Sequence, residues 1–186
     1  MKKAFIAIIA LFLVAGIMGK CRASTIPDEA PPKTYYFDLG EQIVHDVDAY
    51  FPLLQGLSIA RAQDTVVIRV ANFGGSLWVG AILFNSIQSS KAYVIMDVVA
   101  PSFSMGAMLA CAGKEIRLHP YSMLMYHSGS TQQEGKVSEI QASLNASERL
   151  VRKMFAQCLR FGILTQEQIN EILNGKDIYV FPEDLK

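Results

Sequence analysis

The sequence predicts an α/β domain built around a mainly parallel sheet. Runs rich in β-branched residues, at Thr65–Ala71 and Ala92–Val99, alternate with segments whose apolar residues recur at helical spacing. Strands that alternate with helices in this way are typical of crossover units, which join parallel neighbours. The chain has 186 residues, of which 51% are hydrophobic and 18% charged, and this suits one domain with a substantial core.

In the first half of the domain, glycines separate the expected elements. Gly40 ends the first strand, and Gly74-Gly75 ends the second. Between them, apolar residues from Ile43 to Leu57 follow the spacing of one helix face. The expected elements, in chain order, are strand Thr34–Leu39, helix 41–60, strand Thr65–Ala71, helix 76–89, strand Ala92–Val99 and helix 104–111.

In the second half, His119-Pro120 separates two short strands, and a polar loop precedes a long amphipathic helix. Thr165-Gln166-Glu167-Gln168 is a capping box that begins a shorter helix. The expected elements are strands Glu115–Leu118 and Tyr121–Tyr126, loop 128–135, helix 136–161, helix 165–173 and an apolar closing segment at 177–182.

The N-terminus predicts export. Residues 1–23 read as a signal peptide, because two lysines precede an apolar stretch at 4–19 and Cys21-Arg22-Ala23 offers small residues where a peptidase cuts. That stretch is shorter than the ~20 apolar residues of a spanning helix, and an uncleaved membrane anchor over 4–19 is the alternative. A Pro-rich linker, 24–34, then leads to the domain at 35–186. We therefore expect a periplasmic or otherwise extracytoplasmic protein.

Composition narrows the class of partner. The formal net charge is zero, which argues against nucleic-acid binding. No cysteine, histidine or acidic cluster has metal-ligand spacing, so neither a metal nor a cofactor is expected. Once Cys21 leaves with the signal peptide, Cys111 and Cys158 remain. They could pair in an oxidising compartment, but cysteines in apolar helical patterns are more commonly buried free thiols.

Ser104 and His127 suggest a nucleophile and its base. Ser104 opens a small-residue helix after an apolar strand, and His127 closes a later apolar run. A serine at such a turn has backbone N–H groups of the new helix beside it. Of the three histidines, His45 is most simply a surface or interface residue, and His119, next to a proline, is more simply structural.

A serine nucleophile also needs an orienting acid and donors for the oxyanion. Asp177 is the best-placed acid, since it follows a helix-ending Asn174-Gly175 turn. Asp97 lies within a strand, and Asp184 is near the chain end. The N–H groups of Gly75 and Met105 suit the oxyanion hole, one at the end of a neighbouring strand and one opening the nucleophile helix.

Two other serine arrangements have less support in the sequence. The Gly-x-Ser-x-Gly elbow of α/β-hydrolases is absent, because Ser102 occupies the place of its first glycine. A Ser/Lys dyad has no obviously placed lysine, although Lys114 and Lys136 stay open as candidates.

The order of these motifs resembles the proteolytic subunit of Clp protease, the ClpP family. The resemblance rests on Gly74-Gly75 before a helix, Ser104-Met105-Gly106-Ala107 opening the next, the stretch from Pro120 to His127, and Asp177 in a turn, and it covers about residues 35–186. It implies a ClpP/crotonase-like fold, a spiral of ββα units with a long C-terminal handle helix, and a serine peptidase domain.

What the resemblance implies for function is peptide-bond hydrolysis. Ser104 is then the nucleophile, His127 the general base and Asp177 its orienter, with the Gly75 and Met105 N–H groups as oxyanion hole. The family assembles as paired rings joined through the long helix, so a homo-oligomer is expected. The substrate would be a short or unfolded polypeptide, and an exported protein would have no ATP-driven AAA+ unfoldase as partner.

This chain also departs from the family pattern. Asn72-Phe73 stands where the family usually has Ser-Pro before its paired glycines, and the spacing from Ser104 to His127 is about two residues shorter. The alternative is therefore a non-catalytic assembly or binding protein on the same fold. Acyl-CoA chemistry of the crotonase type is a third hypothesis, which suits an exported location poorly.

Overall fold

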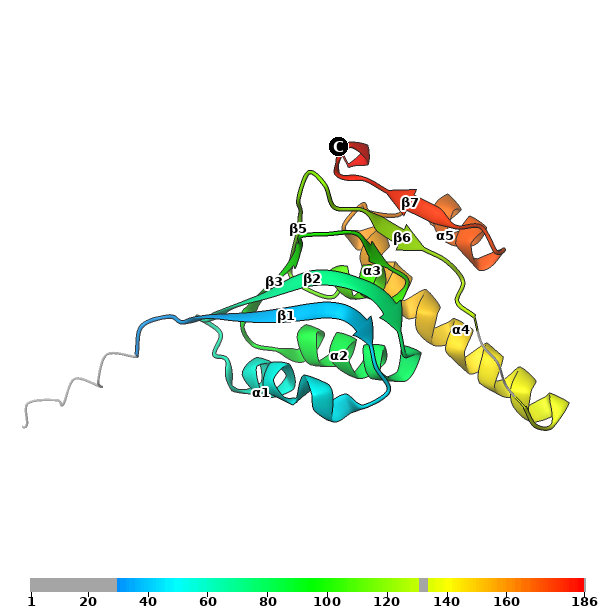
Figure 1. Ribbon diagram of the computed structural model, residues 1–186, viewed down its shortest axis with the longest axis horizontal. Coiled ribbons are helices and arrows are strands. Elements are labelled where there is room, and N and C mark those ends of the chain that lie inside the picture. The colour runs from blue at the N-terminus through cyan, green and yellow to red at the C-terminus, as the bar shows by residue number, and fades with distance from the viewer. Residues whose placement is uncertain (1–29, 131–133, 186) are drawn as a thin grey trace, which may run out of the picture. The chain divides into compact units, whose positions relative to one another are not determined.

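The computed structural model describes residues 30–130 and 134–185 (Figure 1). The chain divides into two units at Pro31/Pro32, and the second unit holds all the regular structure that is described. The predicted signal peptide at 1–23 lies outside the described residues. The elements are β1 Thr34–Ile43, η1 Val47–Tyr50, α1 Phe51–Ile59, β2 Thr65–Gly75, α2 Leu77–Ser89, β3 Tyr93–Val98, β4 Ser102–Phe103, α3 Met105–Ala110, β5 Glu115–Leu118, β6 Leu124–Tyr126, α4 Val137–Arg160, α5 Gln166–Leu173, β7 Ile178–Val180 and η2 Pro182–Asp184.

The larger sheet has the strand order β1-β2-β3-β5, and all its neighbours run parallel. Its two central strands are buried along both faces over Val66–Ile68 and Val94–Met96. Continuous apolar runs of this kind are typical of strands covered on both sides. The helices α1 and α2 lie together along one side of this sheet (Figure 1). The predicted α/β class with a parallel sheet is confirmed.

A second sheet, of order β4-β6-β7, was not predicted as a separate sheet. β4 pairs parallel to β6, and β6 pairs antiparallel to β7. Its first strand is only two residues long, too short for sequence alternation to show. Ser104 therefore follows a strand of this small sheet, not the long strand of the parallel sheet.

The predicted helix over 41–60 is wrong in its first part. β1 continues to Ile43, which pairs with Gly75 after an irregularity in register. A 3-10 turn then begins after Asp46, whose side chain accepts the Asp48 N–H, and the α-helix itself covers only Phe51–Ile59. The apolar spacing of this segment reflects strand pairing at its start and helix packing at its end.

The long helix α4 has 24 residues, and it is buried mainly in its second half. Its buried residues are Val151, Met154, Phe155 and Cys158. The first half extends away from both sheets (Figure 1). In the described residues, no helix is both long and apolar enough to cross a membrane.

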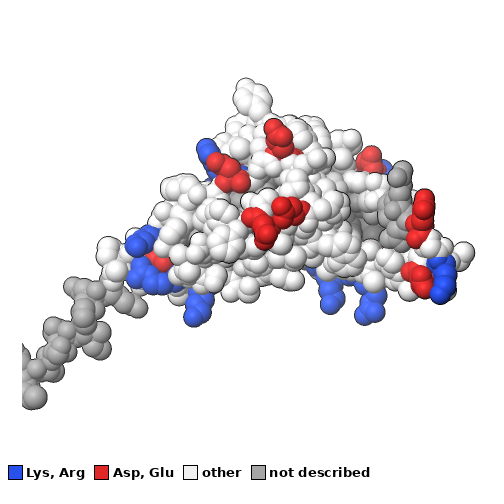
Figure 2. Space-filling view, turned by 60° about the horizontal axis from the view of Figure 1, so that its bottom comes forward, with Lys and Arg blue, Asp and Glu red and all other residues white. Residues whose placement is uncertain are grey.

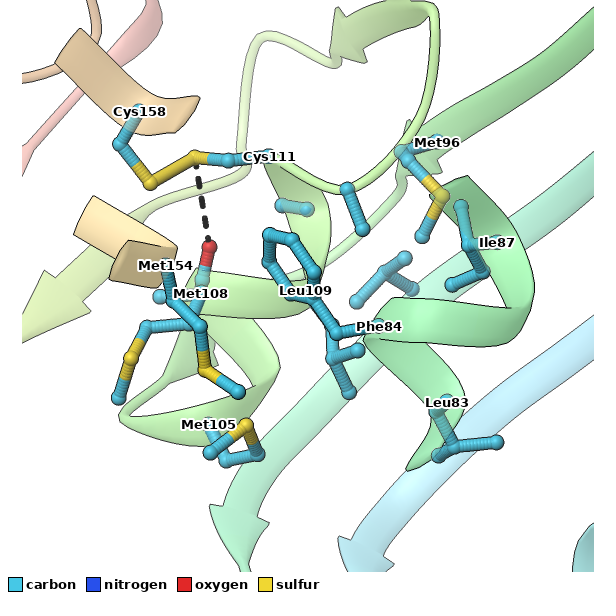
Figure 3. Packing of buried hydrophobic residues seen from close by; sticks show 14 of the residues in the cluster. Leu83, Phe84, Ile87, Met96, Met105, Met108, Leu109, Cys111, Met154 and Cys158 are labelled. Atoms are coloured by element: carbon cyan, nitrogen blue, oxygen red, sulfur yellow. Dashed lines mark hydrogen bonds between the residues drawn. A yellow bond between two sulfur atoms is a disulfide. The ribbon is translucent and has the colours of Figure 1, made fainter. Parts of the chain in front are cut away.

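A disulfide joins α4 to the end of α3. Cys111 and Cys158 are bonded, with Cα atoms 5.1 Å apart, so the expectation of buried free thiols is wrong. Both cysteines are fully buried, beside Met108 and Met154 (Figure 3). Sequence pattern favoured free thiols because each cysteine sits on an apolar helix face, and only the packing of α3 against α4 brings the two together.

A buried carboxylate fixes the start of the parallel sheet. Asp64 is 1% exposed, and its oxygens accept hydrogen bonds from the Arg61 guanidinium, the Arg61 N–H and the Lys33 N–H. These bonds, the Arg61 side chain first, hold the pKa of Asp64 well below its usual range. Asp64 thereby ties the entry of β1 to the entry of β2.

We expect removal of the disulfide to destabilise the domain without changing its fold. The bond closes a loop across a sequence separation of 47 residues, and such a cross-link typically contributes about 2–4 kcal/mol. The double variant Cys111→Ala/Cys158→Ala should therefore unfold at lower urea concentration than the oxidised protein. Equal midpoints for the two proteins would contradict a stabilising role.

We expect stability to fall in acid partly through Asp64. The pKa of Asp64 is lower in the folded than in the unfolded chain. Its carboxylate therefore adds to the free energy of unfolding above the unfolded-state pKa of about 4, and this stabilisation is lost as the pH falls toward the folded-state pKa. Asp64→Asn should lower the melting temperature at neutral pH and flatten its dependence on pH below about 4. The exposed pair Asp38–Arg69 offers the control Asp38→Asn, for which a smaller effect is expected.

Candidate active site

Ser104 lies at a sharp turn between β4 and α3. Its φ and ψ are 55° and −123°, a left-handed conformation that non-glycine residues seldom adopt. Two backbone bonds hold it there: the Ser104 N–H donates to the Met125 carbonyl at 2.8 Å, and the Ser104 carbonyl accepts the Met108 N–H at 3.0 Å. The side chain is half-buried. Strain of this kind concentrates at functional sites, where the surrounding structure maintains it.

The end of β2 approaches Ser104 closely. A Cβ at Gly74 would lie 2.6 Å from the Ser104 Cβ and 3.1 Å from its Oγ, and Gly74 itself has a φ of +92°. Only a glycine allows this contact. The sequence placed Gly74-Gly75 and Ser104 on successive strand ends, and the structure brings these ends into contact.

The two predicted oxyanion donors flank this turn. Met105 is the first residue of α3, and the first N–H groups of a helix have no acceptor within it. Gly75 has a φ of +136°. The Ser76 N–H donates to the Ile43 carbonyl of β1 at 2.8 Å, which ties the residue after Gly75 to β1.

The small sheet places His127 and Asp177 at its end. β6 pairs with β7 through Tyr126 and Ile178, the last pair of this antiparallel register, so His127 follows β6 and Asp177 precedes β7 at the same end of the sheet. β4 pairs with β6 through Phe103 and Met125, so Ser104 follows its strand at the same end. The three residues thus follow or precede adjacent strands of one sheet.

The three side chains are nevertheless not linked. Among the described residues, no hydrogen bond joins the Ser104 hydroxyl to His127, or His127 to Asp177. His127 Nδ1 instead accepts the Gly129 N–H at 3.2 Å, which places the proton of a neutral ring on Nε2. In a working triad the Nδ1–H donates to the carboxylate, so this ring is in the other tautomer. The exposed Asp177 therefore has no role in orienting His127 in this conformation.

The other histidines lie elsewhere. His119 Nε2 is 3.0 Å from the Asp97 carboxylate. The two side chains form a pair on the parallel sheet, and this contact gives each of them a structural role. His45 is exposed between β1 and η1. Within the described residues, neither histidine forms a hydrogen bond with Ser104, in agreement with the structural interpretation of these residues.

The two lysines considered for a Ser/Lys dyad and the alternative acid, Asp184, all have partners away from Ser104. Lys114 Nζ donates to the Ala92 carbonyl at 2.6 Å, and Lys136 Nζ lies 3.4 Å from the Glu139 carboxylate. Asp184 accepts the Phe181 N–H at 2.9 Å and caps the last turn. These contacts do not favour a Ser/Lys dyad. Within residues 30–130 and 134–185, no group of three or more histidine, cysteine or acidic side chains is arranged to hold a metal ion.

Comparison with known families identifies the family of this chain. The family model for Clp protease matches residues 37–184. The chain belongs to the Clp protease family. Membership supports a peptidase function, and it confirms the ClpP/crotonase-like α/β fold that the sequence resemblance implied. The match spans both sheets and the long helix, so it includes all the elements that carry Ser104, His127 and Asp177.

The sequence did not identify Asn72 as part of the site. Its side chain is fully buried, and its Oδ1 accepts the Gly74 N–H at 2.8 Å. Asparagine commonly bonds the backbone two residues on, in an Asx turn. The pattern Asn-x-Gly at the end of a buried strand is therefore the sequence signal for this turn, and Asn72-Phe73 stands where Ser-Pro is usual in the family.

Proposed function

We propose that this protein is an extracytoplasmic serine endopeptidase that cuts short or unfolded polypeptides. The observation that carries the proposal is the register of the small sheet, which gathers Ser104, His127 and Asp177 at one end. The strained backbone of Ser104 and the family match support the same role for it. No cofactor is needed for this chemistry.

The proposed reaction follows an acyl-enzyme route. His127 takes the Ser104 proton as Oγ attacks the peptide carbonyl, and the Gly75 and Met105 N–H groups donate to the oxygen that becomes negative. The protonated ring then gives its proton to the leaving amine. Water, deprotonated by the same ring, attacks the ester and returns Ser104 to its starting state.

This route requires His127 to change its partner. Its Nδ1 accepts the Gly129 N–H in the described conformation, so Nδ1 must first exchange that bond for one to Asp177. Residues 128–130 are exposed, which leaves room for the backbone to move. In the productive state Nδ1–H donates to the Asp177 carboxylate, and Nε2 faces Ser104.

The disulfide supports the proposed location. Disulfides persist in secreted and periplasmic proteins and are rare in the cytosol, and the bond here is buried. Together with the predicted signal peptide, it favours an oxidising compartment. An AAA+ unfoldase would have no supply of ATP in that compartment. The proposed substrates are therefore short or already unfolded chains.

The layer formed by α1 and α2, called here the helix layer, supports self-association. Neither α1 nor α2 contains a charged residue, and helices apolar around their circumference are typically buried. Yet Phe51, Ile59, Trp78 and Ile82 are between 43% and 62% exposed. Figure 2 shows charged side chains in small separate groups on a largely uncharged surface. Clp protease family members typically form rings, and we propose that copies of this chain cover this layer.

A non-catalytic assembly protein is the alternative. The observation that favours it is the Gly129 bond to His127, which leaves the ring in the tautomer that cannot work with Asp177. In that case the fold and the self-association would be kept while Ser104 remained unreactive.

The first test is chemical labelling of Ser104. A fluorophosphonate should modify Ser104 in the folded protein, and Ser104→Ala should abolish labelling and lower peptide hydrolysis by at least about 10⁴-fold. Asp177→Asn should lower kcat by roughly 10³–10⁴-fold, because the ring loses its orienting carboxylate. Asp184→Asn, which alters a carboxylate outside the triad, is the matched control and should retain activity. A folded wild-type protein that neither labels nor cleaves would support the non-catalytic alternative.

The second test concerns assembly. Trp78→Ser combined with Ile82→Ser should shift the mass in analytical ultracentrifugation toward the single chain, since the apolar face that copies would cover is lost. Tyr121→Ser is the control, because Tyr121 is 93% exposed and lies outside the helix layer. A wild-type protein that is already monomeric, or an oligomer unchanged in the double variant, would contradict this interface.

A further inference from the structure

Asn72 is a buried amide whose two ends are both bonded. It lies near the end of β2 and is 0% exposed. Its Nδ2 donates to the Gly40 carbonyl of β1 at 2.8 Å, and its Oδ1 accepts the Gly74 N–H at 2.8 Å. A buried polar side chain is costly unless it is satisfied in this way. Its two bonds join the end of β1 to the Gly74-Gly75 turn.

The bond to Gly74 bears on the conformation of the turn. Gly74 and Gly75 have φ values of +92° and +136°, and glycines populate many backbone conformations with little preference. A pair of glycines therefore does not hold an N–H in one direction by itself. The Asn72 Oδ1 fixes the first of the two peptide groups, and the β1 pairing at Ser76 fixes the residue after them. The Gly75 N–H lies between these two anchors.

Asn72 also lies against the elements that carry Ser104. A Cβ at Gly106, in the first turn of α3, would come within 2.8 Å of the Asn72 Oδ1 and 2.9 Å of its Cβ. The Asn72 N–H donates to the Ser102 hydroxyl of β4 at 3.3 Å. One residue therefore touches the glycine turn, the strand before Ser104 and the helix after it.

We infer that Asn72 is a positioning residue that aims the Gly75 N–H at the oxyanion formed when Ser104 attacks. Asn72 does not itself contact the substrate in this role. It sets the direction of one donor and the spacing between that donor and the nucleophile helix. The inference rests on the proposed peptidase function and deepens it.

Three variants separate this role from a general effect on folding. Asn72→Ala removes both side-chain bonds. Asn72→Ser keeps a short hydroxyl, which can form the corresponding turn more weakly. Ser90→Ala is the matched control, because Ser90 is a buried hydroxyl that donates to the Leu57 carbonyl and has no contact with the site.

We expect Asn72→Ala to lower kcat by about 10- to 100-fold, below the 10²–10³-fold typical when an oxyanion donor is removed outright. KM should stay within about two-fold, since the donor acts on the transition state more than on the bound substrate. Affinity for a peptide aldehyde, which forms a tetrahedral adduct with the serine, should fall by the same factor as kcat. Asn72→Ser should recover most of the loss, and Ser90→Ala should leave kcat unchanged.

Hydrogen exchange supplies a readout that needs no activity. The Gly74 amide should exchange faster in Asn72→Ala than in the wild type, and it should stay protected in Asn72→Ser. If Asn72→Ala fails to fold, Asn72→Ser carries the test, because its hydroxyl forms the turn more weakly: the small fall expected in its kcat should be matched by an equal fall in aldehyde affinity, and an unequal fall would overturn the inference.

The outcomes distinguish this inference from the function on which it rests. If the wild type is active and kcat is unchanged in Asn72→Ala, the inference alone is overturned. The same holds if kcat falls in Asn72→Ala but aldehyde affinity does not fall with it. It also holds if Ser90→Ala lowers kcat as much as Asn72→Ala does. A wild type in which Ser104 neither labels nor cleaves overturns the proposed function and this inference with it.

Discussion

The contact between the Gly74 backbone and Ser104 is the constraint on which the site depends. It leaves no room for a Cβ at Gly74, and it brings the end of β2 in the parallel sheet against the turn between β4 and α3. In the proposed mechanism, this contact sets the spacing between the Gly75 N–H and the Met105 N–H. The strained conformation of Ser104 is stabilised on the other side by the Met125 carbonyl, so the turn is held from both sheets.

The nucleophile side of the site is better fixed than the base side. Ser104 is held by backbone bonds and by a helix that the Cys111–Cys158 disulfide ties to α4. His127 begins an exposed segment, and its ring bonds its own neighbour Gly129. That is why the peptidase and non-catalytic hypotheses differ at His127 and not at Ser104.

Several elements were predictable from local pattern. The runs around Val66–Ile68 and Val94–Met96 indicated buried strands, and the capping box at Thr165 marked the start of α5, where its side chain does accept the Gln168 N–H. Ser104 and His127 could be singled out because each ends an apolar run. The two-residue β4 and the pairing of Ile43 with Gly75 could not be predicted, since both depend on partners distant in the sequence.

The sequence by itself determined the fold class, the family and the residue types that could carry the chemistry, because these follow from periodicity, turn residues and motif order along the chain. The tertiary structure alone decided that Cys111 bonds Cys158, that Asn72 donates to the Gly40 carbonyl of the neighbouring strand, and that Gly74 packs against Ser104. Each of these is a contact whose geometry arises only when separate elements or loops pack together. Local sequence specifies which side chains are available, whereas the packing of β2, β6, α3 and α4 specifies which of them meet.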